Sequence, residues 1–208
     1  MKAISLFSGA GGMDVGFKST GFEVIAANEM DKHACDTFRT NHPETNLFEG
    51  DIDLCGEEIR SYREVDVIFG GPPCQGFSVA GKMDLEDPRS KLIFSFCKVV
   101  EDVNPKVFVM ENVKALGSLT KFDEIRKALI SRFHKAGYAV TLHLLNSKDF
   151  GVPQSRERIF FIGVKNEITP IFAANFNKYR KMAPTLRDVL IPLGVPGSKH
   201  RVIVNSGV

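Results

Sequence analysis

KAISLFSGAGGMD, residues 2–14, joins a short apolar run to a turn that contains three glycines. Glycine lets the backbone turn tightly and approach a ligand, and a strand that enters such a turn before a helix is typical of nucleotide-binding α/β sheets. Gly9, Gly11 and Gly12 do not complete the G-x-G-x-x-G spacing, which disfavours a pyrophosphate-bearing dinucleotide. The stretch predicts an α/β fold with a nucleoside site after its first strand.

Short apolar runs recur along the chain and predict a sheet. They cover residues 3–7, 22–27, 46–49, 65–69, 106–110, 140–145 and 159–164. Most lack apolar/polar alternation, as do strands that are buried on both faces. Helical patterns lie between them, clearest at 90–103, after the start signal Asp87-Pro88, and at 121–136. The last two runs have no helical pattern between them, so we expect them to pair antiparallel in a doubly wound, seven-stranded, otherwise parallel sheet with helices on both faces.

Composition sets the broad class. The 208 residues are 43% apolar and 25% charged, which suits one sizeable globular domain, and the net charge of +2 is too mild to indicate nucleic-acid binding by itself. No apolar run approaches the roughly 18 residues of a membrane span, and the N-terminus does not resemble a signal peptide, so a cytoplasmic protein is expected. The four cysteines show no C-x-x-C spacing, and neither a metal site nor a disulfide framework is predicted.

Acidic residues follow the second and third predicted strands. Glu29 ends the second, and Asp51 follows the third. The carboxyl ends of parallel strands share one edge of the sheet, where a carboxylate can accept hydrogen bonds from ribose hydroxyls. The alternative is a tight turn beside two surface carboxylates. The glycine-rich turn, Glu29 and Asp51 follow three successive predicted strands, and this coincidence favours a nucleoside site.

Cys74 follows two prolines at the end of the fourth predicted strand. Pro72 and Pro73 stiffen the backbone there, so the thiol is expected on a rigid loop at the ligand-binding edge. The alternative for any cysteine is a small buried apolar residue. Cys97, within an apolar helical pattern, fits that alternative, whereas the loop-forming neighbours of Cys74 do not.

Four motifs together resemble the DNA cytosine-5 methyltransferase family. PPCQGFS at 72–78 resembles the nucleophile motif, and FSGAGG at 7–12 the first cofactor motif. ENV at 111–113 and QSRER at 154–158 resemble two more, in the family's order within residues 5–163. The resemblance implies a class I S-adenosylmethionine-dependent methyltransferase fold, which is Rossmann-like, and a catalytic domain over residues 1–165.

The resemblance implies an enzyme that methylates C5 of a flipped-out cytosine in double-stranded DNA, within a restriction-modification system. Cys74 would attack C6, Glu111 would bind N3 and the 4-amino group, and Arg156 and Arg158 would hold the 2-oxo group. Alternation along a strand would put both arginines on one face. The alternative to a role in the site is a pair of solvated arginines at the edge of a strand. DNA contacts are assigned to Gln75, Ser78, Lys82 and Arg89. Such a protein is expected at the nucleoid.

The implied cofactor is S-adenosyl-L-methionine, which leaves as S-adenosyl-L-homocysteine. Its contacts are assigned to the glycine-rich turn, to the next two strand ends and to two residues near the methionyl part. They are Phe7, Ser8, Gly9, Ala10, Gly11, Gly12, Glu29, Met30, Asp51, Ile52, Pro72 and Leu92. Met30 departs from the bulky aromatic residue that is frequent in the family, so weaker stacking on adenine is expected.

The family's target-recognition domain and last two motifs have no counterpart before Val208. Residues 166–208, with Pro170, Pro184, Pro192 and Pro196, are expected to be a linker and the start of that recognition region. The alternatives are a shortened chain or natural fragment, a subunit whose partner polypeptide supplies the missing part, and a degenerate binding protein. A transfer-RNA cytosine-5 methyltransferase ranks lower, because that branch usually departs from Gly76 and Ser78. Weak activity on DNA is expected for this chain alone.

Overall fold

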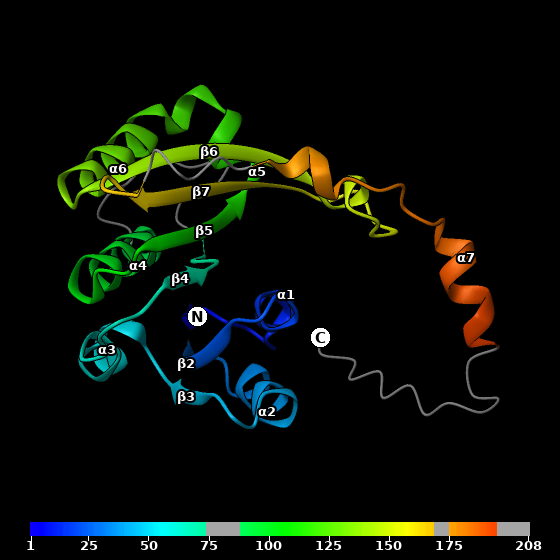
Figure 1. The fold of residues 1–208 in the computed structure, drawn as a ribbon, viewed down its shortest axis with the longest axis horizontal. Coiled ribbons are helices and arrows are strands. Elements are labelled where there is room, and N and C mark those ends of the chain that lie inside the picture. The colour runs from blue at the N-terminus through cyan, green and yellow to red at the C-terminus, as the bar shows by residue number, and fades with distance from the viewer. Residues whose placement is uncertain (74–87, 169–174, 195–208) are drawn as a thin grey trace. The chain divides into compact units, whose positions relative to one another are not determined.

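The computed structural model describes residues 1–73, 88–168 and 175–194. Its strands form one seven-stranded sheet in the order β3-β2-β1-β4-β5-β7-β6 (Figure 1). All seven predicted strands are present. They are β1 (Lys2–Leu6), β2 (Glu23–Glu29), β3 (Asn46–Glu49), β4 (Val67–Gly70), β5 (Val107–Val113), β6 (Tyr138–Asn146) and β7 (Glu157–Lys165).

The strand directions confirm a mostly parallel sheet that ends with reversed pairing. β1, β2, β3, β4 and β5 pair parallel, and β7 runs antiparallel to β5. At one end of the β6–β7 pair the Asn166 amide donates to the Gly137 carbonyl at 3.1 Å, and at the other the Ser147 amide donates to the Arg156 carbonyl at 3.0 Å. The partners' numbers run in opposite directions, so these two strands are also antiparallel, as their loop connection predicts.

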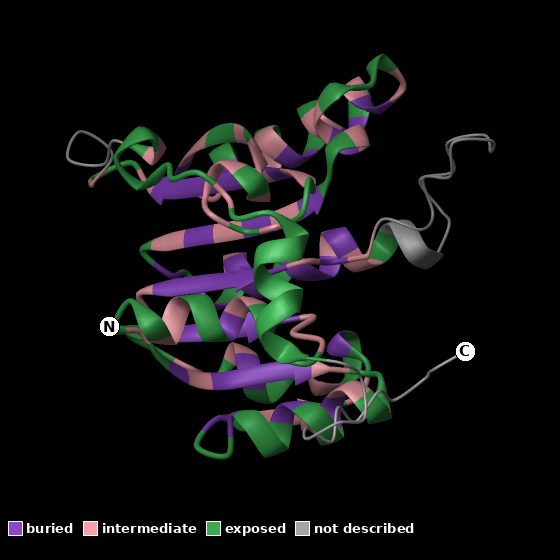
Figure 2. Cartoon of the chain, turned by 90° about the vertical axis from the view of Figure 1, so that its right-hand side faces the viewer, coloured by how far each residue is buried: buried purple, intermediate pink, exposed green. Residues whose placement is uncertain are grey.

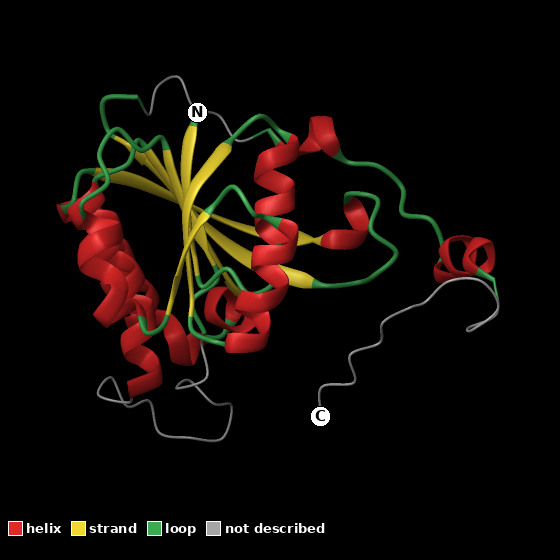
Figure 3. Ribbon diagram, turned by 90° about the horizontal axis from the view of Figure 1, so that it is seen from below, coloured by secondary structure: helices red, strands yellow, loops and turns green. Residues whose placement is uncertain are grey.

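Helices cover both sides of the sheet (Figure 3). The helical patterns at 90–103 and 121–136 correspond to α4 and to a 3₁₀ turn that continues into α6. Asp31 and Asp51 start α2 and α3 by accepting hydrogen bonds from main-chain amides. The helices are α1 (Gly12–Ser19), α2 (Lys32–Asn41), α3 (Ile52–Arg60), α4 (Pro88–Val103), α5 (Lys114–Ser118), α6 (Asp123–Lys135) and α7 (Leu186–Leu190), with 3₁₀ turns η1 (Thr120–Phe122), η2 (Ser147–Asp149), η4 (Phe176–Tyr179) and η5 (Ile191–Leu193).

Two apolar clusters hold the helices to opposite faces. The larger joins α3, α4 and α6 to the sheet, where the Phe108 and Phe133 rings stack with centroids 4.0 Å apart. The smaller packs α1 onto the other face through Phe17, whose ring stacks on Phe69 at 3.8 Å. Gly163 lies opposite Phe108 in the β5–β7 register, and a Cβ there would lie 1.9 Å from the Phe108 ring. The glycine makes room for the aromatic core.

Burial along the strands follows their place in the sheet. β1 is buried from its second residue on and β4 throughout, as the lack of alternation predicts. β6 lies at the sheet's edge and is mostly half-buried or exposed. The strands through the middle of the sheet are the most continuously buried in Figure 2. No helix within 1–73, 88–168 or 175–194 is long and apolar enough to cross a membrane.

The chain divides into two compact units. Unit 1 comprises Met1–Leu144 and Arg158–Ala173, and unit 2 comprises Leu145–Glu157 and Ala174–Val208. Unit 2 therefore contains the connection from β6 to β7 as well as most of the segment that follows β7. The functional boundary expected between residues 165 and 166 stays a prediction.

Candidate active site at the carboxyl edge of the sheet

The glycine-rich turn has a fixed, partly strained backbone. Phe7, Gly9 and Gly11 have positive φ angles of 53°, 56° and 89°, a region that side chains other than glycine rarely adopt. A Cβ at Gly11 would lie only 2.2 Å from His42 Nε2. Gly11 is therefore required both by its backbone conformation and by the imidazole ring packed beneath it.

Glu29 ties this turn to the end of β2. Its Oε2 accepts a hydrogen bond from the Gly9 amide at 2.7 Å. Its Oε1 accepts from the amides of Met30 and Asp31, at 2.8 and 2.9 Å. The carboxylate that the sequence predicts as a ribose acceptor thus orders the main chain of the glycine-rich turn and of the residues that follow β2.

Asn28, which sequence reasoning missed, holds the next strand end. Its buried side-chain amide donates to the carbonyls of Phe48 and Gly50, each at 3.0 Å. An asparagine at the end of an apolar run was the available signal. Through Asn28 and Glu29, the ends of β1, β2 and β3 form one connected edge.

The other predicted cofactor residues are differently exposed. Asp51 accepts from the Asp53 amide at 2.9 Å and caps α3. The Ile52 side chain is 2% exposed and lies in the core, so only its main-chain groups can contact a ligand at the surface. Met30 is 63% exposed, whereas Leu92 is half-buried and packs on the larger core cluster.

Sequence reasoning also missed two buried polar residues beneath the turn, Asp14 and His42. Asp14 is fully buried in α1 and accepts a hydrogen bond from Ser5 Oγ at 3.0 Å, and burial raises the pKa of its carboxyl. His42 is 3% exposed, with its Nδ1 2.8 Å from Lys18 Nζ. An aspartate among the apolar positions of α1 was a signal in the sequence. These residues support the turn from inside.

Glu111 lies at the same edge, within β5. The apolar run predicted at 106–110 stops just before it, whereas pairing with β7 continues β5 to Val113. Glu111 Oε1 lies 2.9 Å from Arg158 Nε, diagonally across the β5–β7 ladder, in which Arg158 faces Val113. The structure therefore brings together two predicted catalytic residues.

The main chain that leads to Cys74 begins beside this pair. The Asn112 side chain, 2% exposed, donates to the Pro72 carbonyl at 3.0 Å. A Cβ at Gly71 would lie 3.1 Å from Glu111 Oε2, and one at Gly70 would lie 2.1 Å from the Leu6 carbonyl oxygen. Asn112 therefore fixes the start of the Pro72-Pro73 loop next to the Glu111 carboxylate.

Comparison with known proteins identifies the family. The family model described as "C-5 cytosine-specific DNA methylase" matches residues 1–200. The chain belongs to this family. It has the fold of S-adenosylmethionine-dependent methyltransferases, as the motifs predict.

Two relatives and one solved structure show how far the similarity extends. The type II methyltransferase M.AquIA of Picosynechococcus sp. is 46% identical over 176 residues, which cover 78% of this chain and 71% of that protein. M.NgoPII of Neisseria gonorrhoeae is 43% identical over 193 residues, which cover 91% and 56%. A prophage-encoded protein of E. coli, whose description assigns it to the DNA modification methyltransferases, superposes with a TM-score of 0.79 at 31% identity, covering 95% and 56%. This methylase chain thus spans 71% of M.AquIA but little more than half of the other two proteins.

The family and fold imply a methyl donor of the S-adenosylmethionine type, and the glycine-rich turn of this methylase fits one. Ser8 Oγ is buried without a hydrogen-bond partner among the residues that the structure describes. Next to it in the chain, the position of a Cβ at Gly9 has no heavy atom within 4 Å. An unsatisfied hydroxyl and open space at one turn suit a polar ligand.

Of the remaining predicted site residues, some lie outside the part of the chain that the structure describes. Cys74, Gln75, Ser78 and Lys82 lie outside the described residues, as does the side chain of Arg89 in the first turn of α4. Arg156 is exposed and precedes β7, so strand alternation does not relate its side chain to that of Arg158. Within the described ranges, no group of three or more His, Cys, Asp or Glu residues is arranged to hold a metal ion.

Proposed function

We propose that this chain carries the catalytic centre of a DNA (cytosine-5-)-methyltransferase of a restriction-modification system. In this proposal the enzyme transfers a methyl group from S-adenosyl-L-methionine to C5 of a flipped-out cytosine, through a covalent bond between Cys74 Sγ and cytosine C6. Membership of the methylase family and the names of its type II relatives support this reading.

The observation that carries the proposal is the hydrogen bond from Asn112 to the Pro72 carbonyl. It connects the strand that bears Glu111 to the loop that continues to Cys74. Glu111 and Cys74 have complementary roles in activating one pyrimidine ring, so they must be held near each other. A buried hydrogen bond between their two segments is the support that such a centre needs.

Cys74 would act as the nucleophile. C5 of cytosine is a weak nucleophile, but addition of a thiolate to C6 makes it an enamine-like carbon. A thiol with an ordinary pKa is only about a tenth ionised at pH 7.5, so nearby cations or main-chain amides must favour the thiolate. After methyl transfer, water or another base would take the C5 proton, the C5–C6 double bond would re-form, and Cys74 would leave C6 as a thiolate.

Glu111 and Arg158 would stabilise the ring during this addition. Negative charge develops on the pyrimidine, and a proton or hydrogen bond at N3 offsets it. The Arg158 guanidinium, 2.9 Å from Glu111, would orient this carboxylate before the base enters. As the base enters, Glu111 would take a proton from solvent and donate it to N3, while its other oxygen accepts a hydrogen bond from the 4-amino group. Arg156 and Arg158 would hold the 2-oxo group.

The carboxyl edge of β1, β2 and β3 would hold the cofactor. The main chain of Phe7 to Gly12 would surround its methionyl part, with Pro72 and Leu92 nearby. Glu29 would accept a ribose hydroxyl, Phe7 and Met30 would lie on either side of the adenine, and Asp51 and the Ile52 amide would bind its edge. When bound, S-adenosyl-L-methionine supplies an electrophilic methyl group and leaves as S-adenosyl-L-homocysteine.

The substrate would be duplex DNA with the target base extruded, which costs a few kcal/mol and requires compensating contacts. Gln75, Ser78, Lys82 and Arg89 are our candidates for these contacts. A recognition segment, carried by the same protein or by a second polypeptide, would choose the sequence. Such an enzyme would act at the nucleoid.

Trapping with 5-fluorocytosine tests the proposal. Fluorine at C5 cannot leave as the proton does, so the enzyme should remain bonded to DNA after methyl transfer. We expect a denaturation-resistant adduct when the chain is incubated with S-adenosyl-L-methionine and duplexes carrying 5-fluorocytosine. The adduct's mass should equal that of protein plus DNA plus one methyl group.

Two substitutions give the matched comparison. Cys74→Ser should abolish the adduct, whereas Cys55→Ser, at a half-buried thiol outside the proposed centre, should leave it unchanged. An adduct that survives in Cys74→Ser would disprove the covalent role of this cysteine. If the unmodified chain binds cofactor but forms no adduct until a recognition polypeptide is added, the chain is the catalytic subunit of a split enzyme.

A further inference from the structure

The two units of the chain differ in net charge, and unit 2 is the positively charged one. Its residues, 145–157 and 174–208, include eight Lys or Arg and three Asp or Glu, a net charge of +5. The other residues include 19 and 22, a net charge of −3. The net charge of +2 for the whole chain is therefore the sum of a basic unit and an acidic unit. Basic segments attract nucleic-acid phosphates.

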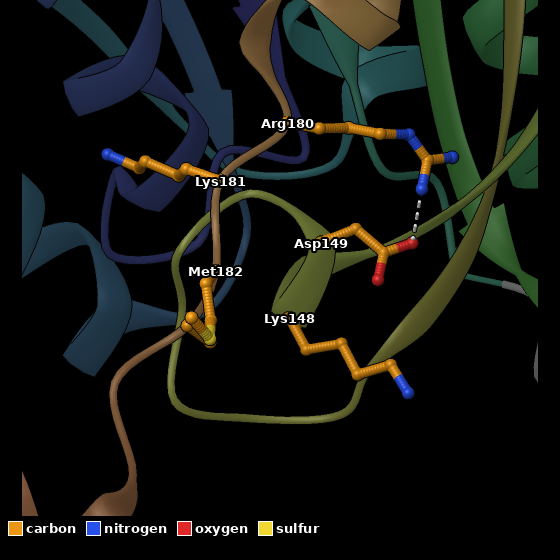
Figure 4. A pocket seen from close by; sticks show the side chains of 6 residues that line it. Lys148, Asp149, Arg180, Lys181 and Met182 are labelled. Carbon is orange, nitrogen blue, oxygen red and sulfur yellow. Dashed lines mark hydrogen bonds and ion pairs between the residues drawn. The ribbon is translucent and has the colours of Figure 1, made fainter.

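Unit 2 contains a pocket of about 550 Å³ (Figure 4). It is lined by Lys148, Asp149, Arg180, Lys181, Met182 and Ala183. These residues come from two segments, one at η2 and one directly after η4.

Main-chain contacts hold the two walls of the pocket together. The Lys181 amide donates to the Asp149 carbonyl at 3.0 Å, and Phe150 and Lys181 form a β-bridge. Arg180 Nη1 lies 3.1 Å from Asp149 Oδ2. The cationic side chains thus start from a backbone arrangement that is already fixed.

The pocket has unmatched positive charge. Among the described lining residues Asp149 is the only acidic one, and this carboxylate is already paired with Arg180. Lys148 and Lys181 are exposed, and neither ammonium group has an ion pair with any residue that the structure describes. In Figure 4 both side chains extend away from the Asp149–Arg180 pair, in different directions. The arrangement suits an extended polyanion better than a small neutral ligand.

A second lysine-lined pocket provides a contrast. On α6, a cavity of about 500 Å³ is lined by Lys127, Ile130, Ser131, His134 and Lys135. There Lys127 pairs with Glu124 at 2.8 Å, and the pocket lies in the acidic unit 1. Exposed lysines are common. Within the described residues, one of the two lysines of this second pocket is neutralised by an ion pair, whereas neither lysine of the unit 2 pocket is.

We infer that the pocket of unit 2 binds backbone phosphates of duplex DNA through Lys148 and Lys181. This inference rests on the proposed function and deepens it, because it assigns DNA contacts to residues outside the family motifs. Phosphate contacts position a protein on the duplex without reading its sequence. Arg180, held by Asp149, would keep the two lysines in place.

Salt dependence of binding tests the inference. The variant Lys148→Gln/Lys181→Gln removes both charges and keeps much of each side chain's length, which matters because the Lys181 stem packs over Gly151. The matched control is Lys127→Gln/Lys135→Gln. Binding of the full chain to a fluorescent DNA duplex is measured by anisotropy between 50 and 200 mM KCl.

Loss of two phosphate contacts should reduce the slope of log affinity against log salt by about 1.8. Over this fourfold rise in salt, the unmodified chain and the control should lose about 12-fold more affinity than the pocket variant. An unchanged slope, an equal change in the control, no duplex binding by the unmodified chain, or tighter binding to an RNA duplex would each overturn the inference.

The 5-fluorocytosine adduct separates this inference from the proposed function. An adduct formed by a pocket variant whose salt slope is unchanged would leave the proposed function standing without the phosphate site. A reduced slope together with no adduct under any condition would identify a DNA-binding protein without the proposed chemistry.

Discussion

Replacement of Gly11 by alanine should weaken the fold through two separable effects. The φ angle of 89° places an alanine in a left-handed conformation, which costs about 1–2 kcal/mol. Its Cβ would lie 2.2 Å from His42 Nε2 and 3.1 Å from the Phe38 ring. The His42 ring is buried against Phe38 and contacts Lys18, so it has little room to move. Such overpacking costs about 1–3 kcal/mol.

The expected loss in the free energy of unfolding is therefore about 2–5 kcal/mol, a large part of the roughly 5–15 kcal/mol of a typical domain. Urea denaturation followed by circular dichroism measures it. Gly16→Ala is the matched control, because Gly16 lies within α1, the helix that Gly11 precedes, without a positive φ and with no heavy atom within 4 Å of its Cβ position. That variant should be more stable by about 0.5–1 kcal/mol.

A second substitution separates the two effects. Gly11→Ala in a His42→Ala background removes the collision and retains the backbone strain, so the loss caused by Gly11→Ala should shrink to about 1–2 kcal/mol. If the loss is the same with and without the imidazole ring, the contact with His42 has no energetic role. If Gly11→Ala is as stable as Gly16→Ala, both parts of the reasoning fail.

Three other substitutions test single contacts. Asn112→Ala leaves the Pro72 carbonyl without its buried donor, so it should cost about 1–3 kcal/mol and lower the yield of the 5-fluorocytosine adduct; an unchanged yield would contradict the role of Asn112. Tyr138→Phe removes the 2.7 Å hydrogen bond to the Pro105 carbonyl and should cost about 1–2 kcal/mol in urea denaturation, whereas no loss would mean that water replaces the phenol. Burial raises the Asp14 pKa above its ordinary 3.8, so stability from this carboxyl is greatest when it is protonated and falls as pH rises through the raised pKa. The stability of Asp14→Asn relative to the unmodified chain should therefore increase from pH 4 to pH 7, and a difference that decreases would show that the pKa shift has the opposite sign.

The sheet could be predicted because its central strands are buried on both faces. Continuous apolar runs mark β1 and β4, and steps of three and four mark α6. The end of β5 could not be located in this way. Glu111 and Asn112 interrupt the apolar run, whereas hydrogen bonding to β7 continues the strand to Val113. Pairing with a strand some 50 residues away leaves no local pattern in the sequence.

Part of the candidate site could be predicted, because glycines and carboxylates directly after an apolar run mark the end of a strand. The glycine-rich turn and Glu29 are of that kind, and the structure joins them by a hydrogen bond. The contacts that support the site were not predictable. Asn112 reaches Pro72 across 40 residues, and His42 packs beneath Gly11 from the end of α2. Such contacts exist only once the chain is folded, and neither follows from spacing along one element.

The hydrogen bonds that Glu29 already accepts limit how many more it could accept from a ligand. An ionised carboxylate has about four lone-pair positions, and the amides of Gly9, Met30 and Asp31 occupy three. The remaining position, on Oε2, would be available to a single incoming hydroxyl. A vicinal diol that donated twice to Glu29 would have to displace the Gly9 amide. Binding of such a ligand would therefore be thermodynamically linked to the order of the turn. Glutamine at position 29 would have one acceptor oxygen for three main-chain amides, so no lone pair would remain to accept a hydrogen bond from a ligand.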